Sequence, residues 1–181
     1  MSAKLKIIIG PMYSSKSSEI IRQSRLMSVI NKKYIVVKPK IDNRYDADKV
    51  STHNLETQTC FVVNRLEEIN DKLDDVEYIL IDEAQFFENL KENVIYYLEE
   101  KNINVVLTGL DGDSNRNKFG EILDLIPYAD SVKKKLALCK ICNDGTEAPF
   151  TKRISQEKSQ ILIGSDNKFM PVCRHHYLNS D

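Results

Sequence analysis

The feature that most constrains this chain is a short apolar run that leads directly into a polar loop near its start. Residues 5–9 read Leu-Lys-Ile-Ile-Ile, and a run rich in β-branched side chains favours a buried strand. Beyond the loop, apolar side chains recur with the spacing of an amphipathic helix at Ile20, Ile21, Leu26 and Met27. A strand, a loop and a helix in this order predict the first unit of an α/β protein.

The same alternation continues over the first 130 residues or so. The expected strands are residues 34–37, 61–63, 78–81 and 104–110, and the expected helices are residues 66–73 and 87–100. The inward stripe of the second helix is expected to be Leu90, Val94, Ile95 and Leu98. This alternation implies parallel β-α-β units around a sheet buried on both faces. Ligands of such sheets bind at the carboxyl ends of the strands, so the polar residues that follow these strands are candidate site residues.

The loop after the first strand, Gly10-x4-Ser15-Lys16-Ser17, differs by one residue from the phosphate-binding pattern G-x-x-x-x-G-K-[ST]. In that pattern backbone N–H groups point at phosphate oxygens, the lysine reaches the terminal phosphates and the hydroxyl binds Mg²⁺. Ser15 stands where the pattern has glycine, so it must adopt a positive φ that is costly for other residues. The alternative is an ordinary turn in which Ser15 caps the helix.

An acidic pair, Asp82 and Glu83, follows the strand expected at residues 78–81. Such a pair at a strand end is commonly a solvated turn. Downstream of a phosphate loop, however, the two carboxylates can divide the chemistry. Asp82 would hold Mg²⁺, directly or through water, while Glu83 would accept a proton from an attacking hydroxyl group. If water attacked instead, the same pair would serve an ATPase.

Two chelating pairs, Cys139-x2-Cys142 and Cys173-x2-His176, lie about 30 residues apart. Three sulfurs and one imidazole suit a closed, tetrahedral zinc site of structural type. His175 competes with His176 for the fourth position. Between the two pairs, residues 150–154 and 160–163 could form a hairpin.

Length and charge set further limits. A chain of 181 residues suits one compact domain with a small appendage. We expect a nucleotide-binding domain over residues 1–133 and a zinc-binding unit over residues 134–181, the latter too poor in apolar residues to fold without a staple. The formal net charge of -1 argues against nucleic acid or an anionic membrane as a partner. The opening apolar run is too short for a signal peptide, so we expect a cytoplasmic protein.

Six blocks of the chain, taken in order, resemble the type II, zinc-containing thymidine kinase family. They are residues 10–17, residues 42–45, residues 81–87, residues 110–112 with Phe119-Gly120, residues 151–153, and the two zinc pairs. The resemblance implies a P-loop α/β domain with a small zinc domain whose lasso-like loop covers the nucleoside. It implies transfer of the γ-phosphate of ATP to the 5′-hydroxyl of thymidine, giving dTMP. It also implies a homotetramer and feedback inhibition by dTTP.

The resemblance assigns site residues by position. Those that would hold ATP and its metal are Gly10, Pro11, Met12, Tyr13, Ser14, Ser15, Lys16, Ser17, Asp42, Arg44, Asp82 and Gln85, with Glu83 as general base. Those around the thymidine would be Met12, Phe86, Leu110, Phe119 and Thr151, with a lasso of Gln160, Ile161, Leu162, Ile163, Gly164 and Phe169. Structural Zn²⁺ would be held by Cys139, Cys142, Cys173 and His176.

Four residues depart from the family pattern: Ser15 stands for glycine, Ser114 for an aromatic, Phe169 for tyrosine and His176 for cysteine. Two other functions remain open. The chain could be an ATPase or nucleotide switch that uses its zinc unit for docking, or a kinase of another deoxynucleoside. Without the motifs, Phe86 and Phe119 would more often be core residues than substrate contacts.

Overall fold

The computed structural model describes residues 2–42, 49–51, 57–156 and 168–179. Its centre is a six-stranded sheet in the order β5-β2-β6-β7-β1-β8, and all neighbouring strands in it run parallel. The strands are β1 Leu5–Ile9, β2 Tyr34–Pro39, β5 Phe61–Val63, β6 Tyr78–Ile81, β7 Asn104–Gly109 and β8 Ser131–Lys134. A separate antiparallel pair joins β3 Lys49–Ser51 to β4 Thr57–Thr59. The expectation of a parallel α/β fold is confirmed.

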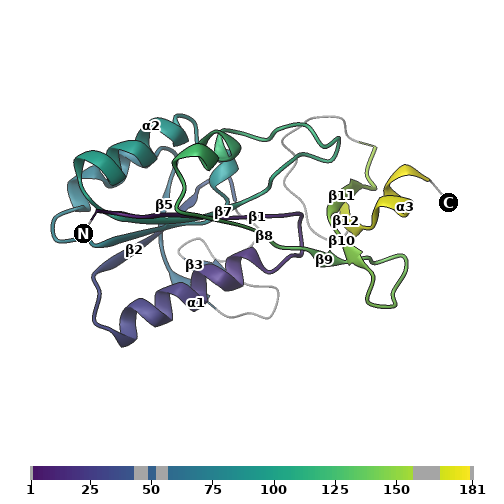
Figure 1. Ribbon diagram of the computed structural model, residues 1–181, viewed down its shortest axis with the longest axis horizontal. Helices are drawn as coiled ribbons and strands as arrows, with labels where there is room; N and C mark the ends of the chain where they lie inside the picture. The colour runs from purple at the N-terminus through teal and green to yellow at the C-terminus, as the bar shows by residue number, and fades with distance from the viewer. Residues whose placement is uncertain (1, 43–48, 52–56, 157–167, 180–181) are drawn as a thin grey trace.

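Helices cover both faces of this sheet. The helix α1, Lys16–Val29, lies on one face, and α2, Leu90–Ile95, lies on the other (Figure 1). Side chains of β1 alternate between two cores, because Leu5, Ile7 and Ile9 face the α2 side while Ile8 packs with α1. The sheet is therefore buried on both faces, as the alternation of elements predicted. No helix in the described residues combines the length and apolar character needed to cross a membrane.

The remaining helical segments differ in detail from expectation. The helix expected at residues 66–73 is a 3-10 helix, η1 Leu66–Lys72. Another 3-10 helix, η4, spans Ile122–Tyr128. The helix expected from residue 87 begins at Leu90 and ends in a π-helical turn, η3 Tyr96–Glu100.

The predicted inward stripe of this helix is wrong in part. Leu90 and Val94 are fully buried and Leu98, partly buried, packs against the same core, but Tyr97 is buried in place of Ile95, which is only partly covered. The burial of Tyr97 leaves no unpaired polar group, because its hydroxyl donates a 2.9 Å hydrogen bond to the Leu66 carbonyl.

The C-terminal part is a small unit of short strands. In it β9 Ala137–Leu138 pairs with β10 Glu147–Ala148, β11 Phe150–Arg153 pairs with β12 Phe169–Val172, and α3 Arg174–Leu178 follows. The antiparallel partner of residues 150–153 is thus β12, whereas the expected partner, residues 160–163, lies outside the described residues. The domain boundary after residue 133 stays a prediction, and it falls inside β8, whose Lys134 pairs with Ile9.

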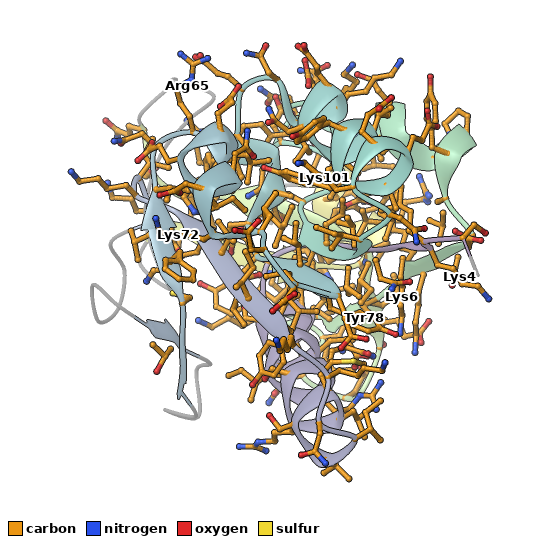
Figure 2. The ribbon with its side chains drawn as sticks, turned by 90° about the vertical axis from the view of Figure 1, so that its left-hand side faces the viewer. Lys4, Lys6, Arg65, Lys72, Tyr78 and Lys101 are labelled. Carbon is orange, nitrogen blue, oxygen red and sulfur yellow. The ribbon has the colours of Figure 1, made fainter. Side chains whose placement is uncertain are left out.

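The two edges of the main sheet differ. Figure 2 views the edge where strands begin, with Lys4 just before β1 and Tyr78 at the start of β6. The carboxyl ends of the strands point toward the C-terminal unit (Figure 1). The connection is direct, because the N–H of Lys135 donates a 2.8 Å hydrogen bond to the Ile9 carbonyl. The edge expected to bind ligands therefore faces the small unit.

Candidate active site and metal cluster

The loop between β1 and α1 holds two residues in the left-handed region of backbone conformation. Ser15 has φ 59° and ψ 38°, and Tyr13 has φ 64°. Non-glycine residues cost about 1–3 kcal/mol each in such conformations and persist only where surrounding contacts hold them. Within the described part of the chain, Ser15 makes no side-chain capping hydrogen bond to α1. This geometry favours a phosphate loop over a capped turn, since an uncapped helix N-terminus attracts anions.

The side chain of Lys16 folds back over this loop. It is almost fully buried, and its Nζ donates a 2.6 Å hydrogen bond to the Pro11 carbonyl. The Ser14 hydroxyl donates to the same carbonyl at 2.8 Å. The ammonium group is therefore held at the inside of the loop, where a bound phosphate could replace the carbonyl as its partner.

Asp82 lies almost fully buried at the carboxyl end of β6. The hydroxyl groups of Thr108 and Ser17 donate hydrogen bonds to its carboxylate. Burial first, and then the charges of Glu83 and Asp42, raise the pKa of Asp82 to about 6, although the two hydroxyl groups oppose the rise. The fold thus brings a hydroxyl of the loop and a carboxylate of β6 together, and oxygen ligands of this kind suit Mg²⁺.

Glu83 is the next residue, and it is also buried and in the left-handed region, with φ 49°. The side-chain amide of Gln85 donates a 2.6 Å hydrogen bond to Glu83 Oε2. Gln85 Oε1 in turn accepts a 3.0 Å hydrogen bond from the N–H of Leu110. The Glu83 carboxylate is therefore held in one orientation through Gln85.

Two glycines make room for Gln85. A Cβ on Gly109 would lie 2.5 Å from Gln85 Oε1, and a Cβ on Gly120, where φ is 61°, would lie 2.3 Å from the Gln85 carbonyl oxygen. Carbon and oxygen atoms that are not bonded do not approach so closely, so a larger residue at either position would displace Gln85.

Several residues expected around a nucleoside contact one another or the phosphate loop. The rings of Phe86 and Phe119 pack edge to face, with centroids 5.3 Å apart. Thr151 is buried, and its hydroxyl oxygen accepts a 2.9 Å hydrogen bond from the N–H of Met12. Phe169 is also buried, beneath the guanidinium group of Arg153. The fold therefore brings the phosphate loop against β11 of the C-terminal unit.

Some expected site residues cannot be placed in this way. Arg44 and the lasso residues Gln160, Ile161, Leu162, Ile163 and Gly164 lie outside the described residues. Ser114 is described, and its carbonyl accepts a 2.8 Å hydrogen bond from the hydroxyl of Tyr177. Its main chain therefore joins the loop after β7 to α3.

The Cys3His cluster fits a tetrahedral metal. The sulfurs of Cys142 and Cys173 are 3.8 Å apart, and Nδ1 of His176 lies 3.3 Å from each of them and 3.5 Å from the sulfur of Cys139. Tetrahedral zinc bonds of about 2.3 Å to sulfur and about 2.0 Å to nitrogen separate two sulfurs by about 3.8 Å, and sulfur from nitrogen by about 3.5 Å. The observed distances match this geometry, so the four residues could hold Zn²⁺.

The thiols of the cluster differ in how readily they ionise: burial and the neighbouring sulfurs raise the pKa of Cys142 to about 11, whereas Cys139 loses its proton more easily. Burial opposes ionisation of Cys139, but hydrogen bonds from backbone N–H groups lower the pKa of this thiol to about 6. The thiolate is the form that binds zinc, so a thiol that ionises readily is a good zinc ligand. His175 is turned away from the sulfurs, since its Nδ1 lies 3.3 Å from the side-chain nitrogen of Asn179. The geometry therefore favours His176 as the fourth ligand.

Two residues near the site were missed by sequence reasoning. Thr108, which bonds to Asp82, directly follows the apolar residues 105–107 of β7, and a hydroxyl at a buried strand position is a signal that could have revealed it. Lys135, whose Nζ donates a 2.9 Å hydrogen bond to the Ser15 carbonyl, belongs to a run of lysines that looks like a solvated surface. Only the fold distinguishes it from its neighbours.

The fold and these clusters define an α/β protein with a phosphate-type loop, an acidic pair at the carboxyl edge of a parallel sheet, and a Cys3His cluster. A profile of the thymidine kinase family matches residues 3–177. The chain belongs to the thymidine kinase family.

Three relatives show how far the similarity extends. The chain is 40% identical over 182 residues to a thymidine kinase of Oryza sativa subsp. japonica, covering 97% of this chain and 66% of that protein. It is 36% identical over 184 residues to thymidine kinase a of Arabidopsis thaliana, covering 99% of this chain and 76% of the relative. It is 33% identical over 178 residues to a thymidine kinase of Pseudothermotoga lettingae, covering 98% of this chain and 96% of the relative.

Proposed function

We propose that this chain is an ATP-dependent thymidine kinase, which transfers the γ-phosphate of ATP to the 5′-hydroxyl of thymidine and yields dTMP. Membership in the family supports this activity. The observation that carries it is the buried Glu83, held by Gln85 beside the hydroxyl-carboxylate pair of Ser17 and Asp82. A carboxylate oriented next to a metal-type site can act as the base of a phosphoryl transfer.

ATP would bind with its phosphates in the loop of residues 10–17. Lys16 would exchange the Pro11 carbonyl for phosphate oxygens, and the N–H groups at the start of α1 would face the same anion. Ser17 and Asp82 would hold Mg²⁺, with Asp42 and Arg44 close to the phosphates. When bound, the metal ion neutralises charge on the phosphates.

Glu83 would take the proton of the thymidine 5′-hydroxyl as that oxygen attacks the γ-phosphorus. The new bond joins the 5′-oxygen to phosphorus, and the bond from phosphorus to the β-γ bridging oxygen breaks, so ADP leaves with that electron pair. Gln85 keeps the Glu83 carboxylate in place, because its amide donates to Oε2 while its own oxygen is held by Leu110. Orientation of this kind lowers the entropic cost of reaching the transition state.

The thymidine would contact Met12, Leu110, the Phe86 and Phe119 pair, and Thr151. Residues 160–164 with Phe169 would cover it from the C-terminal unit, and Zn²⁺ would stabilise that unit through the Cys3His cluster. We further propose a cytoplasmic homotetramer that is inhibited by dTTP, with the family resemblance as the support. An ATPase or nucleotide switch is not favoured, since the named relatives are thymidine kinases.

The test is the variant Glu83→Gln, with Glu88→Gln as control. Glu88 is an exposed glutamate five residues further along the chain. We expect Glu83→Gln to reduce kcat with thymidine by about a hundredfold or more, while the ATP dissociation constant from calorimetry stays within about twofold of wild type. The control should match wild type in both measurements. Turnover by Glu83→Gln close to that of wild type would contradict the role of the base.

The substrate is tested separately with a coupled assay for ADP. Thymidine, deoxycytidine, deoxyguanosine and a reaction without nucleoside are compared with the wild-type chain. Turnover that requires thymidine supports the proposal. Turnover without any nucleoside would identify an ATPase, and turnover with deoxycytidine or deoxyguanosine instead of thymidine would identify a different kinase.

A further inference from the structure

The ring of Tyr13 connects the phosphate loop to the core of the C-terminal unit that carries the Cys3His cluster, which we call the metal unit. It packs against a cluster of buried side chains that the C-terminal unit supplies, which are Ala137, Cys139, Ala148, Val172 and Cys173. Two of these five are candidate metal ligands, and a third ligand, Cys142, packs against the same cluster. A residue of the loop expected to bind ATP is therefore part of the core that surrounds the metal site.

Two hydrogen bonds join Met12 and Ser15, which lie on either side of Tyr13, to later parts of the chain. Thr151, in β11 of the metal unit, accepts from the N–H of Met12 at 2.9 Å. Lys135 Nζ donates to the Ser15 carbonyl at 2.9 Å across 120 residues of sequence. Burial lowers the pKa of Lys135, which is consistent with an ammonium group drawn from solvent toward the loop.

The main chain of residue 135 also contacts the beginning of the loop. Its N–H bonds to the Ile9 carbonyl at 2.8 Å, and its carbonyl oxygen lies so near Gly10 that a Cβ there would come within 2.2 Å. Gly10 is therefore required by the approach of residue 135, in addition to any need of the phosphates. Contacts from the C-terminal part thus meet the loop at its start, its middle and its end.

These contacts bear on the two strained residues of the loop. Tyr13 and Ser15 both have left-handed backbone conformations, and such conformations persist only when surrounding contacts over-determine them. For Tyr13 the contact is the ring in the metal-unit core, and for Ser15 it is the bond from Lys135 to its carbonyl. We propose that the metal unit, through Tyr13, and Lys135, which links this unit to β8, together hold the phosphate loop in its ATP-binding conformation, so that metal occupancy of the Cys3His cluster raises ATP affinity.

Lys135 and Tyr13 are positioning residues in this inference, which rests on the proposed function. Lys135→Met removes the bond to the Ser15 carbonyl, and Lys133→Met is the matched control two residues earlier on the exposed strand β8. We expect Lys135→Met to raise the ATP dissociation constant and KM for ATP by about tenfold, the effect of losing a charged hydrogen bond. Because Lys135 does not touch the reacting atoms here, kcat at saturating ATP should stay within about twofold of wild type.

Tyr13 gives a second, independent route to the same result. Tyr13→Ala removes the ring from the metal-unit core and should weaken both ATP binding and metal retention. Tyr13→Phe keeps the ring and should stay closer to wild type in both measurements. Circular dichroism of each variant shows whether the main sheet remains folded, so a loss of ATP affinity can be separated from general unfolding.

Metal coupling is measured in both directions on the wild-type chain. Removing zinc with a chelator should raise the ATP dissociation constant, and adding Zn²⁺ or Co²⁺ should restore it. By thermodynamic reciprocity, Mg-ATP should lower the fraction of zinc that a competing chromogenic chelator removes at equilibrium, since each ligand stabilises the conformation that the other binds. This decrease should be smaller in Lys135→Met, and the comparison of the two chains also corrects for zinc that ATP itself binds.

These measurements distinguish failure of the positioning role from failure of the proposed function. ATP affinity within twofold of wild type in both Lys135→Met and Tyr13→Ala would overturn the positioning role and leave the proposed function intact. A fall in kcat of Lys135→Met without a change in ATP affinity would also overturn it, by making Lys135 a contact of the transferred phosphate. Failure of the wild-type chain to bind ATP or phosphorylate thymidine would contradict the proposed function and remove the basis of the inference.

Discussion

The parallel sheet and the C-terminal unit achieve stability by different means. The sheet buries aliphatic side chains on both faces, with residues such as Ile8, Leu80 and Leu107 fully covered. The core of the C-terminal unit is small and includes Cys139 and Cys173. A core of that size supplies little hydrophobic stabilisation, and metal binding can replace what is missing. The comparison predicts that the sheet tolerates loss of metal and the unit does not.

The largest expected effect is that of metal removal on structure. Chelation should abolish hydrogen-exchange protection in β11 and β12, whose pairing joins Phe150–Arg153 to Phe169–Val172. Amides of β1 and β7 should keep their protection, because aliphatic packing stabilises the central sheet without a metal. Retained protection of β11 in the metal-free chain would break the comparison.

A cavity in the main core should have the next largest effect. Leu107 is fully buried in β7, so Leu107→Ala should lower the free energy of unfolding by about 2–5 kcal/mol. Leu178→Ala is the control, because Leu178 at the end of α3 is 61% exposed, and it should change stability by less than about 0.5 kcal/mol. Urea denaturation of the metal-loaded chains measures both. Equal losses from the two variants would argue against a core concentrated in the sheet.

Surface charge should have the smallest effect. Hydrogen bonds from Arg22 and Gln23 lower the pKa of Glu19 to about 2, with burial opposing them. A carboxyl group whose pKa falls on folding stabilises the protein above its unfolded pKa of about 4.5, and this contribution is lost as pH falls toward 2. Glu19→Gln should therefore lower stability at neutral pH by about 0.2–1 kcal/mol.

The sign of this effect is tested by denaturation at several pH values. The difference between wild type and Glu19→Gln should shrink as the pH is lowered from 5 to 2. Arg22→Gln, which removes the main partner, should show a loss of similar size at neutral pH. A difference that grew on acidification would contradict the direction of the pKa change.

Local pattern predicted much of the fold because the regular elements have their own periods. The run at residues 78–81 corresponds to β6 without a change of bounds, and the residues of the loop after β1 adopt the positive φ that a phosphate loop needs at Ser15. The pattern could not show that Tyr97 is buried, since a tyrosine is equally suited to the surface. Its burial depends on a carbonyl of η1, 31 residues away in sequence.

The candidate site divides in the same way. Asp82 and Glu83 were found from the residues alone because they directly follow a buried strand, whereas Gln85 was assigned only by the family resemblance. The fold then joined Glu83 to Gln85 and Asp82 to Ser17. Thr108 was missed because its partner belongs to the neighbouring strand. The pairing of β11 with β12 was also missed, because a short strand offers many partners and only packing selects one.

The sequence by itself determined the alternation of elements, the phosphate-type loop and the three cysteine ligands, because each depends on residues spaced closely along the chain. Only the tertiary structure decided that His176 and not His175 faces the sulfurs, and that Lys135 reaches the Ser15 carbonyl. Both depend on where distant segments meet. Such contacts follow from packing of the whole chain, and no local periodicity encodes them.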